Sequence, residues 1–444
     1  MELTARRARS CLMRFLVTGG YGLIGSAVIA RLARDNHQIR ALGRDMRVAA
    51  VRRPDIEWYQ SDFGRMTRAQ DWRELLDGID AVVNCVGILD SGAGDDVRQV
   101  HVTATVALFE ACQAAGIRRV VHFSAIGVDR EQPSAFSKTK LEADKALAAL
   151  DLDWIILRPS VVLGRSAYGA SALLRGVAAL PGFLPVMPDT APLQVVTLDD
   201  VTATVAYFLR PDAPSRLTLE LAGPERLTFT EVALAYRRWL GFSKPRLIDV
   251  PPAIARLFYL AGDFAAALGW RPPVRSAAAR EMQRGAVGDP RQWTKITGIE
   301  PASLSTALAA EPASVQETWF ARLYFFKPLS IVVLSWFWIM TGLLALGPGY
   351  GYGEALMEEG GVGPALGTLA IVGGGLLDFL IGVGIALRKT SRAALWLSIG
   401  VAVLYAIVGT VLVPRLWADP LGPMLKIWPV IVLTMMALAM RLDR

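Results

Sequence analysis

Four apolar runs near the end of the chain constrain its fold more than any other feature. They are Leu329–Leu346, Gly363–Leu387, Ala393–Pro414 and Ile427–Met440. A bilayer core about 30 Å thick needs roughly 20 apolar residues in a helix, so the first three are predicted to span a membrane. The fourth reaches that length if it begins near Leu421 and Lys426 extends its amine to the surface. The sequence predicts an all-α four-helix transmembrane bundle over 328–444, with buried helices of a soluble protein as the alternative.

The charges divide the chain into two unlike parts. Residues 1–319 carry 38 Lys+Arg and 34 Asp+Glu, whereas residues 320–444 carry 9 and 6. The net charge of +7 is dispersed, which argues against a nucleic-acid partner. Three cysteines, at 11, 85 and 112, are too few for a disulfide scaffold, and the three histidines show no metal-ligand spacing. We therefore expect no metal site.

The basic residues around the apolar runs predict an orientation. Basic residues lie beside the first span, between the second and third spans and at the chain end. They are Arg322, Lys327, Arg388, Lys389, Arg392, Arg441 and Arg444. The loop 347–361 holds three glutamates and no Lys or Arg, while Arg415 and Lys426 are exceptions to the pattern. The positive-inside rule then places the N-terminal domain and the C-terminus in the cytoplasm. We expect no signal peptide, and Met13 is an alternative start.

A glycine-rich turn opens the soluble part. Arg14–Thr18 is predicted to be a buried strand, and Ser26–Arg34 has the apolar spacing of a helix. Between them stand Gly19, Gly20, Tyr21, Gly22, Leu23, Ile24 and Gly25. Glycines in this context let the backbone approach a pyrophosphate at the helix N-terminus, so these seven residues are predicted to bind a dinucleotide. The alternative is a plain strand-to-helix turn.

The next strand, Gln38–Leu42, is followed by Gly43, Arg44 and Asp45. An acid there would hold the ribose of NAD, whereas an arginine accommodates the 2′-phosphate of NADP. Arg44 comes first, so we favour NADP(H) over NAD(H). The further predicted strands, which alternate with helices, are Glu57–Gln60, Ala81–Cys85, Val120–Ser124 and Trp154–Leu157. This alternation predicts an α/β fold with a Rossmann-type doubly wound parallel sheet.

From Met13 to Ala310 the chain resembles the short-chain dehydrogenases/reductases, in their extended and atypical branches. Besides the glycine turn, the motifs that carry the resemblance are Asp62-Phe63, Asn84-Cys85-Val86-Gly87, Ser124, Leu157-Arg158-Pro159-Ser160 and Asp199-Asp200-Val201. The resemblance implies that Asp62 and Phe63 contact adenine and that Val86 and Gly87 lie beside the adenine ribose. It implies that Pro159 lies near the nicotinamide and that Ser124 occupies the catalytic serine or threonine position. A plain strand cap is the other reading of Ser124.

The chain departs from this family at one position. The family uses a tyrosine four residues before a lysine that holds the nicotinamide ribose and lowers the tyrosine pKa. Lys140 fits the lysine, but the residue four before it is Phe136, which cannot transfer a proton. Taking Lys138 as the lysine puts Ser134 in the tyrosine position. The same gap occurs in atypical members similar to NmrA-like sensors and to the NADPH-binding accessory subunit of mitochondrial complex I.

The remaining soluble segments, 164–188 and 223–301, are expected to form a small substrate subdomain. Within it Ala253–Trp270 is an apolar helix with two charges, which either packs on the subdomain or lies against the membrane surface.

Three further polar residues of the main domain are expected to have no role in the site. Glu142 and Asp144, on the helix that carries Lys140, are expected to be solvated. His122, in the strand Val120–Ser124, is expected to be a packed strand residue.

The C-terminal four-span unit resembles DoxX-like domains in layout and composition. Asp378 lies about 14 Å from the cytoplasmic end of its span, and Tyr405 and Thr341 fall at comparable depth on the neighbouring spans. An ionisable group at that depth is a functional candidate, as a proton or quinone site, or else it forms an interhelical hydrogen bond.

These features predict a tail (1–12), a reductase-like domain (13–310), an amphipathic aromatic linker (311–327) and the membrane domain (328–444). The first functional hypothesis is a membrane-anchored NAD(P)H oxidoreductase acting on a lipid-soluble quinone or isoprenoid. The second is a non-catalytic NADPH-binding module of a membrane complex, and an epimerase or dehydratase is the third. Phe136 favours the second hypothesis, whereas Lys140 and Ser124 favour the first. The sequence identifies no oligomeric or complex partner.

Overall fold

A computed structural model describes residues 12–44, 46–89, 91–92 and 96–441. Asp45, Cys11 and nearly all of the predicted tail lie outside the described residues. The chain divides into two compact units. The first comprises the residues up to Asp263 together with Pro272–Ala321, and the second comprises Phe264–Arg271 and the residues from Arg322 onward. The second unit therefore includes a short piece of the soluble sequence.

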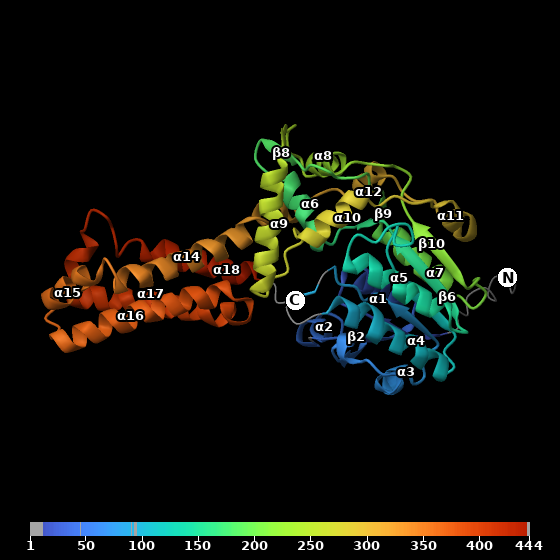
Figure 1. Cartoon of the computed structure of the whole chain (residues 1–444), viewed down its shortest axis with the longest axis horizontal. Helices are drawn as coiled ribbons and strands as arrows, with labels where there is room; N and C mark the ends of the chain where they lie inside the picture. Colours follow the sequence, from blue (N-terminus) through green and yellow to red (C-terminus); the bar gives the residue numbers. More distant parts are fainter. Residues whose placement is uncertain (1–11, 45, 90, 93–95, 442–444) are drawn as a thin grey trace, which may run out of the picture. The chain divides into compact units, whose positions relative to one another are not determined.

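The first unit is built on a seven-stranded sheet in which every pairing is parallel. In spatial order its strands are β10 (Leu217–Leu221), β6 (Asp153–Pro159), β5 (Arg119–Phe123), β4 (Ala81–Asn84), β1 (Arg14–Thr18), β2 (Gln38–Gly43) and β3 (Glu57–Gln60). The strand order reverses direction at β1 and β4, which is where open α/β sheets bind their ligands. The predicted doubly wound fold is confirmed (Figure 1).

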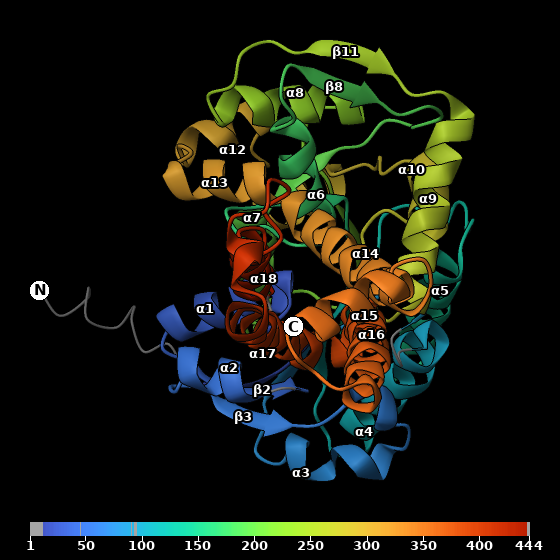
Figure 2. The same ribbon diagram turned by 90° about the vertical axis from the view of Figure 1, so that its left-hand side faces the viewer.

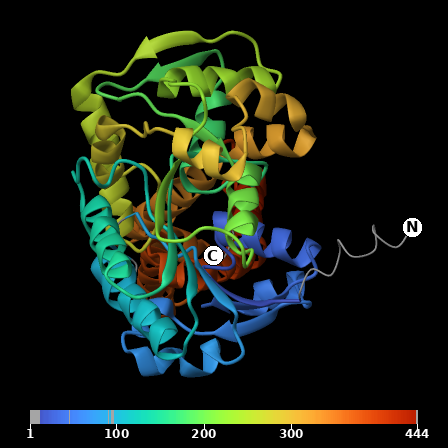
Figure 3. The same cartoon turned by 90° about the vertical axis from the view of Figure 1, so that its right-hand side faces the viewer.

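Helices cover both faces of this sheet (Figures 1 and 3). On one face α1 (Leu23–Arg34) and α7 (Leu198–Phe208) pack their apolar residues against alternate strand side chains. The other face is covered by α3 (Arg73–Leu76), α4 (Ala104–Ala114) and α5 (Ala135–Ala148). The shorter elements between them are α2 (Met46–Arg52), η2 (Phe63–Arg65), η3 (Ala69–Trp72) and η4 (Gln99–Thr103). Burial on both faces explains why the strands are almost continuously apolar.

The predicted small subdomain has two short parallel sheets and a helical layer. The sheets pair β7 (Val161–Leu163) with β9 (Val195–Thr197) and β8 (Phe183–Val186) with β11 (Arg246–Asp249), the latter visible in Figure 2. Its helices are α6 (Gly169–Ala178), α8 (Phe229–Trp239), α9 (Pro252–Ala267), α10 (Ser276–Arg284), α12 (Leu304–Ala310) and α13 (Val315–Leu323). Helix α11 (Arg291–Thr297) instead packs Trp293 into the core of the large sheet. Residues of α6, α8 and α12 form a separate apolar core.

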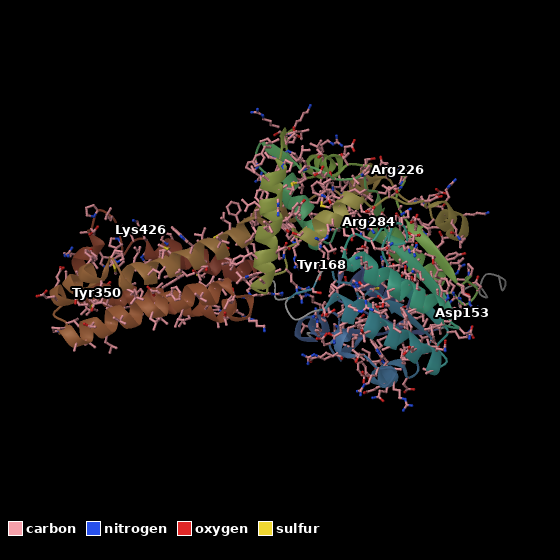
Figure 4. The ribbon with its side chains drawn as sticks, in the orientation of Figure 1. Asp153, Tyr168, Arg226, Arg284, Tyr350 and Lys426 are labelled. Carbon is pink, nitrogen blue, oxygen red and sulfur yellow. The ribbon has the colours of Figure 1, made fainter. Side chains whose placement is uncertain are left out.

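The second unit is a helical bundle. Within the part of the chain that the structure describes, three helices are long and apolar enough to cross a membrane: α14 (Phe326–Leu346), α16 (Pro364–Ala386) and α17 (Arg388–Leu412). A fourth apolar helix, α18 (Ile427–Met440), is shorter. The predicted loop between the first two spans holds α15 (Tyr350–Glu359), and η5 (Pro414–Trp417) follows α17. In Figure 4, Tyr350 and Lys426 lie near the same end of the bundle.

The bundle packs through small residues and turns its large apolar side chains outward. A Cβ at Gly342 of α14 would lie 2.4 Å from the carbonyl oxygen of Gly375, so these helices touch through their backbones. Ser335 Oγ donates a hydrogen bond of 2.9 Å to the Gly382 carbonyl. Leu369 and Val411 are about two-thirds and three-quarters exposed, as lipid-facing residues are. The burial pattern therefore suits a bilayer.

Candidate functional site

The glycine turn lies at the carboxyl end of β1 and has no room for side chains. Gly19 adopts φ +68°, and a Cβ there would lie 3.0 Å from the Cys85 carbonyl oxygen. The Gly22 amide donates to the Gly19 carbonyl at 2.9 Å, which closes the turn. A Cβ at Gly25 would lie only 2.2 Å from that same oxygen. Close approach of α1 to the turn thus requires glycine at these positions.

The N-terminus of α1 is open to an anion. Gly22 is its N-cap and supplies no side-chain hydrogen bond to the first turn. The backbone N–H groups of Leu23, Ile24 and Gly25 are therefore left without intrahelical partners at the positive end of the helix dipole. This arrangement fits the pyrophosphate of a dinucleotide.

Tyr21 connects the glycine turn to the end of β2. Its hydroxyl accepts a hydrogen bond from the Arg44 amide at 3.3 Å, and a Cβ at Gly43 would lie 2.9 Å from its ring. The Arg44 carbonyl also accepts from Gln60 Nε2 at 3.2 Å. Arg44 is exposed at this edge, where an adenosine ribose lies in Rossmann folds. Gly20 packs on α1, because a Cβ there would lie 2.8 Å from Ile29 Cδ1.

Asp62 and Phe63, predicted to contact adenine, have structural partners. Asp62 caps η2 by accepting a hydrogen bond of 3.2 Å from the Gly64 amide. Phe63 is buried and packs edge-on against Trp72 with the ring centroids 5.3 Å apart. Asp62 keeps one side accessible, whereas the Phe63 ring belongs mainly to the core.

Asn84, the first residue of the motif that ends at Gly87, joins the carboxyl ends of three strands. It is fully buried, and its Oδ1 accepts from Thr18 Oγ1 at 2.7 Å and from the Val86 amide at 3.2 Å. Its Nδ2 lies 3.1 Å from His122 Nδ1 on β5. An amide side chain can hold all three because it both donates and accepts. Asn84 thereby sets the backbone that leads to Gly87.

Lys140 of α5 is held at the ends of β4 and β5. Its Nζ donates to the Val86 carbonyl at 3.0 Å and to the Phe123 carbonyl at 2.8 Å, and the residue is 4% exposed. A Cβ at Gly87 would lie 3.4 Å from this Nζ. Two of the three ammonium protons are therefore engaged, and one remains to donate. Burial lowers the pKa of Lys140 to about 8, against the opposing charge of Asp144.

Phe136 occupies the expected tyrosine position one helical turn before Lys140. It packs edge-on against His101 of η4, with the ring centroids 5.6 Å apart. His101 Nε2 accepts from the Ile88 amide at 3.0 Å, and its Nδ1 lies 3.0 Å from Thr139 Oγ1. Burial lowers the pKa of His101 to about 2, so it is neutral and serves as a packed support. Sequence reasoning missed this residue, because no local pattern links it to α5.

The predicted catalytic Ser124 donates its hydroxyl hydrogen bond to Asp144 Oδ2 at 2.9 Å. Asp144 is 3% exposed and also accepts from Arg158 Nε and Nη2 at 3.1 and 3.0 Å. Burial raises the pKa of Asp144, while Arg158 opposes the rise. The expectation that Asp144 is solvated was wrong, because Arg158 on β6 supplies a buried partner.

His122 completes this buried network. It is 1% exposed, as expected for a packed strand residue, and burial holds its pKa well below the ordinary value. Asn84 Nδ2 donates to its Nδ1, so the proton lies on Nε2, which faces Asp144 Oδ1 at 3.7 Å. The network ties α5, and with it Lys140, to the sheet.

We expect Asp144→Ala to lower the free energy of unfolding of β5 and β6 by about 3 kcal/mol. The substitution removes the carboxylate that accepts hydrogen bonds from the buried Arg158 guanidinium and the buried Ser124 hydroxyl. Glu142→Ala is the matched control: Glu142 lies on the same helix and pairs with Arg98 on the surface. Native-state hydrogen exchange of the β5 and β6 amides measures both effects. Equal protection in the two variants would contradict the assigned role.

Pro159 was predicted to lie near the nicotinamide, and Asp200 belongs to a family motif at the start of a helix. Pro159 ends β6 and is buried, and its carbonyl accepts from the Ile126 amide at 3.2 Å. Asp200 lies in the first turn of α7 and accepts weakly from the Ala302 amide at 3.4 Å. The sheet brings Pro159, at the end of β6, to the same edge as Gly19 after β1 and Gly87 after β4, because the carboxyl ends of parallel strands share one edge. Lys140 reaches this edge from α5 through the Phe123 carbonyl at the end of β5.

The small subdomain reaches the start of α5 through Glu281 of α10. Its Oε1 accepts from Ser134 and Ser137, the latter at 2.9 Å, and its Oε2 pairs with Arg284 at 2.9 Å. Ser134 and Ser137 flank Phe136. The contact links residues 144 apart, so no sequence spacing signalled it.

In the membrane unit, Asp378 is 3% exposed and faces the interior of the bundle. Tyr405 Oη donates to its Oδ1 at 2.8 Å, which joins α16 to α17. Thr341 instead donates within its own helix, to the Phe337 carbonyl at 2.8 Å. No cluster of three or more metal-ligating side chains occurs among the residues that the structure describes.

Family models match both units. Residues 19–176 match the NAD(P)H-binding family, and residues 335–435 match the DoxX-like family. The chain is an NAD(P)H-binding domain fused to a DoxX-like domain. The resemblance inferred from the motifs is thereby confirmed, and the protein is a membrane protein by its apolar helices and its DoxX-like region.

Several curated proteins are similar to this chain. Ceramide reductase of Caulobacter vibrioides is 26% identical over 236 residues, which cover 53% of this chain and 73% of that protein. Sterol demethylase protein B of Methylococcus capsulatus is 25% identical over 338 residues, covering 69% and 99%. A photosystem II assembly factor of Synechocystis is 26% identical over 248 residues, covering 55% and 72%.

Solved structures share the fold. A UDP-N-acetylglucosamine 4-epimerase of Bacillus cereus aligns with a TM-score of 0.50 at 18% identity, over 70% of this chain and 96% of that one. A dTDP-glucose 4,6-dehydratase of Bacillus anthracis, solved with NAD, aligns with a TM-score of 0.52 at 16% identity, over 67% and 94%. At these identities the likeness concerns the fold alone.

Proposed function

We propose that this protein is a membrane-anchored, NADP(H)-dependent oxidoreductase of the atypical short-chain type with a lipid-soluble substrate. The observation that carries the proposal is the placement of Lys140 Nζ, buried between the Val86 and Phe123 carbonyls and against Gly87. Burying an ammonium group with one N–H that makes no hydrogen bond destabilises the fold, so a purely structural role does not explain this lysine. The Lys140 ammonium would hold the nicotinamide ribose of a dinucleotide whose pyrophosphate binds at the open N-terminus of α1.

The chemistry of the site follows from these residues. Bound NADPH would supply a hydride. The substrate oxygen must also receive a proton, and Phe136 has none to give. Lys140 Nζ holds a proton at this position, and its pKa of about 8 lies near the range in which a general acid works. His101 is neutral and packs edge-on against Phe136, so neither ring supplies this proton.

Two observations support a lipid-class substrate. The chain joins the dinucleotide domain to apolar helices, so its reaction partner can reside in the bilayer. Two relatives carry names that refer to a ceramide and a sterol. We further propose four membrane spans, with α18 as the fourth. We propose that the NAD(P)H-binding domain is cytoplasmic, because the basic residues cluster at the ends of the spans on its side of the membrane.

The test is NADPH oxidation by the full-length protein in nanodiscs with a panel of quinones, long-chain ketones and oxidised sphingoid or sterol lipids. Turnover with a lipid and none with NADPH alone would support the proposal. Tight NADPH binding without turnover across the panel would instead support a non-catalytic module of a membrane complex. Phe136 is the observation that favours this second function, because it removes the family's proton donor.

We propose NADP(H) over NAD(H) because Arg44 stands exposed at the end of β2. The wild-type protein is expected to bind NADPH at least tenfold more tightly than NADH, since a charge-assisted contact to phosphate contributes about 1.5–3 kcal/mol. Arg44→Ala is expected to reverse the preference. Fluorescence titration with both dinucleotides checks it, with Arg53→Ala, paired to Asp55 on the surface, as the control. Equal wild-type affinities would overturn the assignment.

Asp378 is proposed to contribute to the membrane half of the reaction, as a proton or quinone site. Asp378→Asn keeps an acceptor for the Tyr405 hydroxyl but removes the charge. We expect it to lower turnover of a bilayer substrate roughly tenfold or more while NADPH affinity stays unchanged. Tyr405→Phe is the paired variant. If both variants turn over like the wild type, Asp378 forms only an interhelical hydrogen bond.

A further inference from the structure

Helix α9 carries its large apolar side chains on its outer surface. The exposed members, with their exposed fractions, are Ile254 (46%), Leu257 (64%), Phe258 (54%), Leu260 (51%) and Phe264 (67%). The residues that it buries are small, namely Ala255 and Ala266 at 3% and 6% exposed. A helix packed on a soluble domain shows the opposite arrangement, with its large apolar residues inside.

The packed face of α9 cannot accept a larger residue. A Cβ at Gly262 would lie 1.7 Å from the Val274 carbonyl oxygen. At 100° per residue, Ala255, Gly262 and Ala266 share this face. Leu257, Leu260 and Phe264 lie on the opposite side, and Ile254 and Phe258 lie on the flank away from Arg256 and Asp263. Arg256 and Asp263 both fall on one flank between the two faces. The helix is therefore seated by its small residues, and rotation to bury the large ones is blocked.

The chain after α9 is part of the membrane unit. Trp270 Nε1 donates to the Ala386 carbonyl at 2.7 Å, and the Arg388 amide donates to the Leu268 carbonyl at 3.1 Å. The guanidinium of Arg441 lies 6.0 Å from the Trp270 ring centroid. These contacts fasten the end of α9 where α16 ends and α17 begins. That end of the bundle is rich in positive charge, contributed by Arg271, Arg388, Lys389, Arg392 and Arg441.

We propose that α9 lies in the headgroup layer of an anionic bilayer, with its exposed apolar face against the acyl chains. Helices that lie in the interface combine an apolar face with a charged or polar one. On α9 the charged residues are Arg256 and Asp263, on one flank of the helix. Continuity with the membrane unit places the end of α9 at a membrane surface, and the basic cluster attracts anionic headgroups. The inference does not depend on catalysis.

The interfacial helix also bears on the site. Asp263 pairs with Arg275 at 3.4 Å and accepts from the Ser276 amide at 3.3 Å, which sets the start of α10. The same α10 carries Glu281 to Ser137 at the start of α5. Asp263 of α9 thus connects to α10, which in turn contacts the start of the helix that carries Phe136 and Lys140.

The experiment places a fluorescent NBD label on the full-length protein in nanodiscs of phosphatidylcholine and phosphatidylglycerol. Single cysteines at Leu257→Cys and Phe264→Cys report the outer face, in a background with the native cysteines replaced. Arg256→Cys on the polar flank and Val51→Cys, 80% exposed on α2, are the controls. Doxyl-labelled lipid quenches labels in the acyl layer, and iodide quenches labels in water. NADPH binding by each labelled protein verifies its fold.

We expect doxyl lipid to quench the labels at 257 and 264 about twofold more than the controls, with iodide quenching reduced in parallel. Iodide quenching equal to that at position 51 would show that the face lies in water and would overturn the proposal. Protection from both quenchers would show that protein, such as a second copy, covers the face, and this too would overturn it. Because no turnover is measured, a failed oxidoreductase assignment leaves this result intact.

Discussion

Lys140→Met is expected to lower the turnover of NADPH with a bilayer substrate by about 10²–10³-fold. The substitution keeps the length and apolar bulk of the buried side chain. It removes the ammonium that donates to the Val86 and Phe123 carbonyls and that retains one further proton. NADPH oxidation in nanodiscs gives turnover, and fluorescence titration gives the accompanying loss of affinity.

Lys138→Met is the matched control, because Lys138 lies two residues away on α5 and is exposed. It is expected to behave as the wild type. If the wild-type protein turns over and Lys140→Met turns over equally fast, Lys140 is not the proton-holding group. A wild type without turnover points instead to the non-catalytic NADPH-binding module.

The lowered pKa of Lys140 predicts that turnover and stability change with pH in opposite directions. Turnover requires the protonated ammonium and is expected to fall as the pH rises above about 8. The stability of the fold changes in the opposite direction. Between about pH 8 and pH 10.5, the ordinary pKa of lysine, Lys140 binds a proton in the unfolded chain but not in the folded one. Unfolding free energy therefore rises across this window, by on the order of 3 kcal/mol in total. Lys140→Met is expected to remove both dependences.

Gly25→Ala is expected to raise the NADPH dissociation constant by about 10²-fold or more. The added Cβ would lie 2.2 Å from the Gly19 carbonyl oxygen, far inside contact distance. Either α1 or the turn must shift, and the N–H groups that face the pyrophosphate shift with it. Titration of the full-length protein by NADPH fluorescence measures the loss.

Ser26→Ala is the control for this substitution, because Ser26 is the next residue of α1 and its side chain is exposed. Its NADPH affinity is expected to stay within about twofold of the wild type. A Gly25→Ala protein that binds NADPH as tightly as Ser26→Ala would contradict the close approach of α1 to the glycine turn.

The local patterns of the sequence were sufficient for the framework. The strand, glycine turn and helix from Arg14 to Arg34 appear as predicted, because short-range sterics and apolar spacing determine them. The apolar runs likewise became α14, α16 and α17, because bilayer thickness demands length and apolarity alone. The gap at Phe136 was also visible, since it depends on a spacing of four along one helix.

Other parts of the site could not be predicted in this way. His101 supports Phe136 from a separate helical turn, and Glu281 reaches α5 from 144 residues away. Asp144 was expected to be a solvated helix position. Its partner Arg158 stands on another strand, and only the packing of α5 on the sheet brings the two together.

The sequence alone thus determined which chemistry is present: a glycine turn for phosphate, a lysine without its tyrosine, and apolar helices for a bilayer. These three features can be identified from residue type and spacing, because each depends on residues within a single turn, strand or helix. Only the tertiary structure decided where the charges lie, because burial and pairing depend on contacts between distant segments. It buried Lys140 and Asp144 within the fold, and it turned the large apolar residues of α9 outward.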